Sequence, residues 1–137
     1  MKEDDDWDLV IVGAGPAGLT SGIYTARSGL KTLLVDKGIP GGCMNEASFV
    51  ENYPGFPNGI GGQQLSINMT QQCEKAGAEI HELEHTKNID IKDGKKRVIT
   101  DRDTYKCEAV IVATGTTFRT LGIPSAVSYT HLTLPTN

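Results

Sequence analysis

The N-terminal part of the chain alternates two apolar runs with one amphipathic segment. Residues 9–12 (Leu-Val-Ile-Val) and 33–35 (Leu-Leu-Val) are continuous apolar runs, which are typical of strands buried on both faces. Between them, apolar residues recur at helical spacing: Leu19, Ile23, Ala26 and Leu30. We therefore predict a helix from residue 15 to about residue 28, with Gly29 near its C-cap. The strand-helix-strand order predicts parallel strands joined by a right-handed crossover.

Residues 38–62 form a long segment that is rich in glycine and proline. A loop of this length in a compact domain is usually functional or disordered, and its aromatic residues argue against disorder. A second amphipathic helix follows, predicted by four apolar residues at helical spacing: Leu65, Met69, Cys73 and Ala76. We expect this helix to end at Gly77 and to carry Cys73 on its buried face.

The remaining pattern consists of β segments. Short segments are predicted at about residues 79–83, 89–92, 97–100 and 104–107, with a hairpin turn at Asp93-Gly94. We interpret them as an antiparallel excursion inserted between parallel strands. Residues 109–113 are then expected to form a third buried strand that ends in Thr114-Gly115. The predicted fold class is α/β: a Rossmann-like βαβ fold with a parallel sheet and an inserted antiparallel excursion.

Composition narrows the classes of partner. With 137 residues the chain is long enough for one domain, and its net charge is −4 without any basic stripe. Nucleic acid and anionic membranes are therefore poor candidates for partners. The N-terminus is acidic and polar, unlike a signal peptide, and no apolar run reaches membrane-spanning length. The three cysteines are widely spaced, which favours a reducing cytoplasm over a disulfide framework, and no metal site is predicted.

The first chemical motif is a G-x-G-x-x-G pattern between the predicted first strand and helix. Gly13 allows a sharp turn, Gly15 leaves room for a pyrophosphate, and Gly18 lets the helix pack close to the strand. The free N–H groups and the dipole at the helix N-terminus favour an anion. The motif alone is weak, but its position between strand and helix is the one that dinucleotide binding requires.

Asp36 closes the second predicted strand, where a carboxylate can accept hydrogen bonds from an adenosine ribose and repel a 2′-phosphate. This favours FAD or NAD over NADP at this site. The alternative is that Asp36 only caps the following turn. The small turn at 113–115 and the Gly41-Gly42 pair offer two further close backbone approaches, and a site that uses both favours FAD.

Several motifs together resemble the N-terminal FAD-binding part of thioredoxin reductases. They are "DLVIVGAGPAGLTSGIYTARSGLKTLLVDKG", "VENYPGFPNGIGGQQL", "TYKCEAVIVATG" and "LGIP". The resemblance covers about residues 7–124, which we expect to be the N-terminal part of an FAD-binding domain. Residues 125–137 do not continue the family pattern, and we expect them to be an unstructured, non-native tail.

The resemblance also implies roles for individual residues. Gly13, Gly15, Pro16, Ala17 and Gly18 would hold the FAD pyrophosphate, Asp36 would bind the ribose, and Lys37 would flank it. Gly41 and Gly42 would approach the ribityl chain and the flavin, with Asn52 near the isoalloxazine ring. Cys43 would stand beside the flavin, where the family commonly has Gln. Ala113, Thr114 and Gly115 would line the cofactor again.

The implied activity belongs to a longer parent enzyme, expected to be a cytoplasmic homodimer. Electrons would pass from NADPH to FAD, to a CxxC disulfide and to thioredoxin or a similar disulfide protein. This chain has no CxxC, so we expect the fragment itself to be inactive and to contain no catalytic residue. Two alternatives stay open: a non-catalytic flavin-binding module, and a related reductase without a redox disulfide, of the ferredoxin–NADP reductase type.

Cys43 has a rival interpretation as a redox centre. Disulfide reductases of the glutathione reductase type carry a CxxxxC pair after a Gly-Gly loop, but here Ser48 occupies the second cysteine position. The following "VENYPGF" belongs to the other reductase type. We therefore expect Cys43 to be a small replacement beside the flavin, with a sensor thiol as the alternative.

Overall fold

The computed structural model describes residues 6–92 and 94–116. The predicted boundary at residue 124, the tail 125–137 and Asp93 of the hairpin turn lie outside the described residues. The elements in chain order are β1 (Trp7–Val12), α1 (Pro16–Arg27), β2 (Thr32–Val35), η1 (Gly42–Glu46), α2 (Gly62–Lys75), β3 (Glu79–His81), β4 (Thr86–Lys92), β5 (Lys95–Thr100) and β6 (Thr104–Val112).

The strands form one six-stranded sheet in the order β3-β2-β1-β6-β5-β4. β1 is paired in parallel with β2 on one side and with β6 on the other, so that Val10 lies opposite both Leu33 and Val110. The predicted βαβ unit and the α/β fold class are confirmed. The antiparallel β4–β5 hairpin is also confirmed, with Lys92 opposite Lys95 across the turn.

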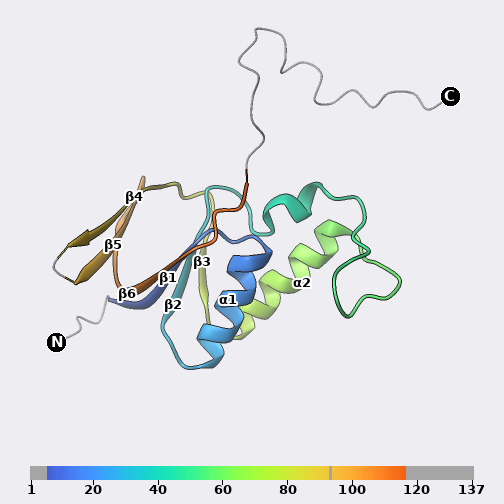
Figure 1. The fold of residues 1–137 in the computed structure, drawn as a ribbon, viewed down its shortest axis with the longest axis horizontal. Coiled ribbons are helices and arrows are strands. Elements are labelled where there is room, and N and C mark those ends of the chain that lie inside the picture. Colours follow the sequence, from blue (N-terminus) through green and yellow to red (C-terminus); the bar gives the residue numbers. More distant parts are fainter. Residues whose placement is uncertain (1–5, 93, 117–137) are drawn as a thin grey trace, which may run out of the picture.

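Buried apolar side chains form two clusters, one on each face of the parallel strands. Figure 1 shows the two helices on one side of these strands and the β4–β5 hairpin on the other. Because side chains alternate along a strand, Leu9 and Ile11 face the helices while Val10 and Val12 face the antiparallel strands. The helical layer also contains Leu19, Ile23, Leu34, Leu65, Met69 and Cys73. The opposite layer is completed by Leu33, Val35, Val98 and Cys107. Full burial of a side chain of this size contributes about 1.5–3 kcal/mol, so both layers fix the position of β1.

The two helices pack closely on one side of the sheet (Figure 1). A methyl group on Gly22 of α1 would lie 2.7 Å from the Sγ of Cys73 on α2. Cys73 is fully buried, as predicted. Gly29 and Gly77 directly follow the C-caps of the two helices, and both have positive φ angles of 82° and 100°. The predicted helix ends are therefore confirmed, whereas Leu30 lies beyond α1 and is 42% exposed.

Three predictions about strands are wrong. β3 is not part of the antiparallel excursion, because it pairs in parallel with β2. The segments predicted at 104–107 and 109–113 are one strand, β6, whose first half pairs with β5 and whose second half pairs with β1. This strand is not buried throughout, since Val112 is 64% exposed. Within the described residues, α1 and α2 pack mainly over β1 and β2 rather than over the end of β6.

Candidate functional site

The turn between β1 and α1 is built from glycines that the protein's own packing requires. Gly13 has a φ of 107°, and a Cβ there would overlap the carbonyl oxygen of Ala113. A Cβ on Gly18 would overlap the carbonyl oxygen of Gly13. These two glycines let the loop turn sharply and let α1 approach β1, which are the roles predicted from the motif.

Gly15 differs from both of these glycines. Its φ of −74° is ordinary, and a Cβ built on it would meet no heavy atom within 4 Å. It is the N-cap residue of α1, no side chain caps the helix, and the first turn carries no acidic residue. The start of α1 therefore faces open space, with N–H groups and a helix dipole that favour an anion.

Two further loops converge on this turn. The N–H of Gly41 donates to the carbonyl of Ala14 at 2.8 Å, and a Cβ on Gly42 would lie 3.3 Å from the Cα of Gly15. On the other side, the N–H of Ala113 donates to Val12 at 2.8 Å, and a Cβ on Gly13 would lie 3.1 Å from the nitrogen of Thr114. The loops at 13–15, 41–42 and 113–114 thus lie together, although they are distant in the sequence.

Asp36 joins this cluster from the end of β2. Its Oδ2 accepts the N–H of Ala14 at 2.6 Å, and its Oδ1 accepts the N–H of Gly38 at 2.8 Å. The carboxylate therefore holds both the glycine loop and its own turn. This geometry gives Asp36 the capping role that was the alternative to ribose binding, and one carboxylate can serve both roles because each oxygen has a second lone pair. Lys37 beside it is exposed.

The segment that follows β3 borders Asp36. The N–H of Leu83 donates to Gly38 at 3.1 Å, and the N–H of Glu84 donates to the carbonyl of Asp36 at 2.8 Å. Leu83 has a φ of 54°, the left-handed region that a branched residue rarely adopts. The backbone partners of this segment lie in the turn after β2, which is distant in the sequence.

A model of the pyridine nucleotide-disulphide oxidoreductase family matches residues 7–136. The chain belongs to this family. It is 43% identical over 124 residues to the thioredoxin reductase of Bacillus subtilis, which covers 90% of this chain and 39% of that protein. It is 42% identical to the 34.2 kDa protein in the rubredoxin operon of Clostridium pasteurianum, over 90% of this chain and 40% of that protein.

The solved structures that match this chain also include thioredoxin reductases. The crystal structure of Lactococcus lactis thioredoxin reductase matches with a TM-score of 0.83 and 41% identity, over 90% of this chain and 40% of that one. The thioredoxin reductase of T. acidophilum matches with a TM-score of 0.83 and 38% identity, over 92% and 41%. The chain thus spans about two fifths of the length of these relatives. It corresponds to the FAD-binding part of a thioredoxin reductase-like flavoprotein.

The open space at Gly15 fits the pyrophosphate of a dinucleotide such as FAD. Among the described residues, no atom lies within 4 Å of a Cβ built on Gly15, so a side chain there would project into the space before α1. A pyrophosphate needs such a space, because backbone N–H groups can approach it only where no side chain intervenes. Pro16 and Ala17, the first residues of α1, are exposed next to this space.

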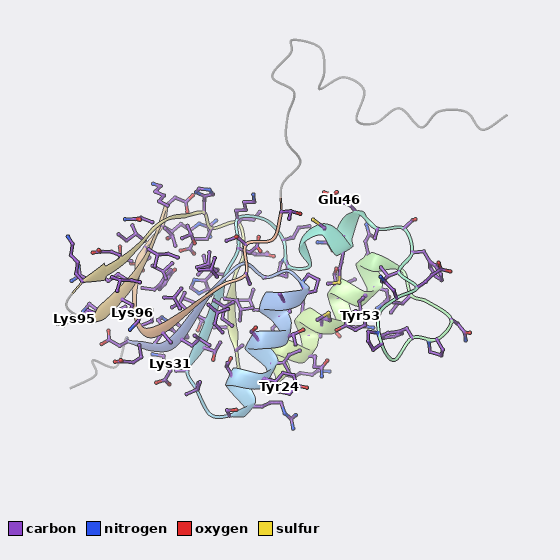
Figure 2. All side chains as sticks on the ribbon, viewed as in Figure 1. Tyr24, Lys31, Glu46, Tyr53, Lys95 and Lys96 are labelled. Atoms are coloured by element: carbon purple, nitrogen blue, oxygen red, sulfur yellow. The ribbon has the colours of Figure 1, made fainter. Side chains whose placement is uncertain are left out.

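The structure does not bring every predicted site residue to this cluster. Asn52 is exposed in a loop whose base is closed by two hydrogen bonds between Val50 and Ile60, at 2.8 and 3.0 Å. Tyr53 of the same loop lies at the end of the molecule opposite to Lys95 and Lys96 of the β4–β5 hairpin (Figure 2). Gly115 is exposed, with a positive φ of 66° and open space beside it.

The three thiols stand in different environments. Cys43 is an exposed free thiol on η1, one residue after Gly42, whereas Cys73 and Cys107 are buried and free. Burial, with a smaller contribution from Glu74, raises the pKa of Cys73 to about 11. Burial also raises the pKa of Cys107. Because neutral thiols are poor nucleophiles, neither buried cysteine is suited to redox chemistry.

Two further features of the described residues bear on ligands. Among residues 6–92 and 94–116, no group of His, Cys, Asp and Glu side chains is arranged to hold a metal ion. Over the same residues, neither helix has the length and apolar character that would let it cross a membrane.

Proposed function

We propose that the chain supplies the pyrophosphate and ribose side of the FAD site in an NADPH-dependent flavoprotein disulfide reductase. The observation that carries this proposal is the contrast among the three glycines of the first loop. Packing accounts for Gly13 and Gly18, whereas a Cβ on Gly15 would meet no described residue and would instead enter the space that a ligand could fill. The identity of about 40% to thioredoxin reductases supports the type of reaction.

In this proposal the chain's own residues bind and orient, and the flavin supplies reversible two-electron chemistry when it is bound. The N–H groups of the first turn of α1 would bind the pyrophosphate, and the free lone pairs of Asp36 would accept ribose hydroxyls. Gly41 and Gly42 would let the second loop approach the dinucleotide. Pro16, Ala17, Lys37, Ala113, Thr114 and Gly115 would line the same cofactor, with Cys43 and Asn52 toward its flavin end.

The complete reaction requires parts that lie outside this chain. NADPH and a proton would reduce a protein disulfide to two thiols and leave NADP⁺, through a CxxC pair that is absent from these 137 residues. We propose thioredoxin or a similar disulfide protein as the acceptor, and a cytoplasmic homodimer as the working form. The similarity to thioredoxin reductases supports the choice of acceptor. The three free cysteines are in keeping with a reducing compartment.

The test is made on the full-length protein. We expect it to purify with about one FAD per chain and to reduce thioredoxin disulfide with NADPH, whereas residues 1–137 alone should show no turnover. Bound FAD without any NADPH-dependent turnover would favour the non-catalytic flavin-binding module. Bound FAD with NADPH-dependent reduction of an artificial electron acceptor, but not of thioredoxin, would favour a reductase of the ferredoxin–NADP type. Absence of FAD from the protein, and no FAD binding by the apoprotein, would refute the proposal.

A further inference from the structure

The most deeply buried carboxyl group of the described residues is that of Glu84, and it lies outside the cluster around α1. Glu84 is only 2% exposed. Its Oε1 accepts the hydroxyl of Thr100 at 2.6 Å and the hydroxyl of Tyr105 at 2.8 Å, from β5 and β6. A buried carboxyl group is costly unless it is hydrogen-bonded, and here two hydroxyls supply the bonds.

A histidine completes this network. The Nδ1 of His81 lies 3.4 Å from the Oε2 of Glu84 and 2.9 Å from the hydroxyl of Tyr105, and its Nε2 lies 2.7 Å from the Oε1 of Glu79. Burial, followed by the hydrogen bond to Glu84, raises the pKa of Tyr105, which keeps its hydroxyl protonated as a donor. The network thus ties β3 and the segment after it to the antiparallel strands β5 and β6.

The backbone of the same segment is hydrogen-bonded to the turn that carries Asp36. The N–H groups of Leu83 and Glu84 donate to Gly38 and Asp36, and the N–H of Asp36 donates to His81 at 2.9 Å. Leu83 adopts the left-handed conformation at φ 54°. Such a conformation persists in a non-glycine residue only where surrounding contacts impose it. The Glu84 carboxyl group, held by β5 and β6, is the anchor immediately next to this strained residue.

We infer that Glu84 is a positioning residue for the FAD site: its carboxyl group fixes the 81–84 backbone, and this backbone fixes the Asp36 carboxylate against the glycine loop. The inference rests on the proposed function and adds to it a residue that is hydrogen-bonded to β5 and β6. Removing the carboxyl group takes away the acceptor that the hydroxyls of Thr100 and Tyr105 share, and the Thr100 hydroxyl is left with the carbonyl of Asp103 at 2.9 Å. The strained backbone at Leu83 can then relax, and Asp36 loses two of the bonds that hold its main chain.

A double-mutant cycle separates positioning from general destabilisation. We expect Glu84→Leu to raise the Kd of FAD at least fivefold, and Glu84→Gln, which keeps an acceptor oxygen, to raise it less than twofold. If Glu84 acts through Asp36, then Glu84→Leu should cause no further loss in an Asp36→Ala background. Equal losses in both backgrounds, or an unchanged Kd in Glu84→Leu alone, would overturn the inference.

Two control variants match the perturbation. Val98→Ala removes volume from the buried layer on β5, opposite Tyr105 in the strand pairing, but it removes no hydrogen-bonding group of the network, and it should leave the Kd of FAD within twofold. Glu82→Leu changes an exposed carboxylate two residues away, and it should also leave the Kd unchanged. If Glu84→Leu does not fold, Tyr105→Phe removes one donor to the carboxyl group and should show the same dependence on Asp36 with a smaller effect.

Amide hydrogen exchange in the apoprotein gives a readout that does not require FAD. The N–H groups of Ala14 and Gly38 donate to the Asp36 carboxylate, so both should exchange at least fivefold faster in Glu84→Leu and at the parent rate in Val98→Ala. Unchanged exchange at both amides would refute the positioning role. A parent protein that binds no FAD would instead refute the proposed function, while the exchange experiment would still decide the structural link.

Discussion

Replacement of Gly15 by Val tests whether this glycine is needed for ligand binding, whereas Gly13 and Gly18 are needed for packing. The residue has φ −74° and ψ −173°, which valine adopts readily, and a Cβ there meets no atom of residues 6–92 and 94–116 within 4 Å. Valine is a poorer N-cap than glycine, at a cost of about 0.5–1.5 kcal/mol. The smaller entropy of the unfolded chain offsets about 0.4–1 kcal/mol of this. The net change in the free energy of unfolding should therefore be about 1 kcal/mol or less.

The effect on FAD binding should be much larger. An isopropyl group at the start of α1 would occupy the space in front of the first-turn N–H groups. Loss of one charge-assisted hydrogen bond to the pyrophosphate costs about 1.5–3 kcal/mol, which corresponds to about 10- to 150-fold in Kd. Loss of several such bonds would leave no measurable FAD on the purified protein. Titration of FAD fluorescence with the full-length apoprotein measures this directly, and thermal unfolding of the same preparation measures stability.

Gly18→Ala is the matched control, because its methyl group would overlap the carbonyl oxygen of Gly13. Overpacking of this kind costs about 1–3 kcal/mol or more, so this variant should lose stability and FAD together. An FAD affinity in Gly15→Val equal to that of the parent would refute the ligand-binding role of Gly15. Destabilisation of the apoprotein by Gly15→Val as large as that by Gly18→Ala would show instead that Gly15 is needed for the fold.

Three further outcomes are expected for the full-length protein. Asp36→Ala should lower the free energy of unfolding by about 1–3 kcal/mol, because the N–H groups of Ala14 and Gly38 lose their acceptor, and it should weaken FAD binding. Lower stability with unchanged FAD affinity would show that Asp36 only holds the turn. Cys43→Ser should keep thioredoxin reduction within a few-fold of the parent, and a loss of several orders of magnitude would place Cys43 in the mechanism. Burial raises the pKa of Cys73 from 9.0 to about 11, so its contribution to stability is intact below pH 9.0 and is lost as the pH rises toward 11. Denaturant unfolding between pH 9 and 11 should therefore be less pH-dependent in Cys73→Ala than in the parent, and equal slopes would contradict this.

The wrong predictions for β3 and β6 show that a hydrophobic pattern does not predict which strands pair. Residues 79–81 have the same short β pattern as the excursion, yet they pair in parallel with β2. Residues 104–112 read as two segments, yet they form one strand that changes partner along its length. A local pattern predicts extended backbone, but the choice of neighbouring strand depends on contacts between residues that are distant in the sequence.

The sequence alone determined the strand-helix-strand unit, both helix ends and the three glycines of the first loop, because these features depend on local backbone geometry and on the spacing of apolar side chains. Tertiary structure decided which glycines are needed by packing and which one leaves room for a ligand. It also gave Asp36 its partner in the glycine loop and placed Glu84, an ordinary acidic residue in the sequence, in a buried network with Thr100 and Tyr105. These properties arise only when segments from different parts of the chain meet, since burial and hydrogen-bond partners are set by the assembled layers.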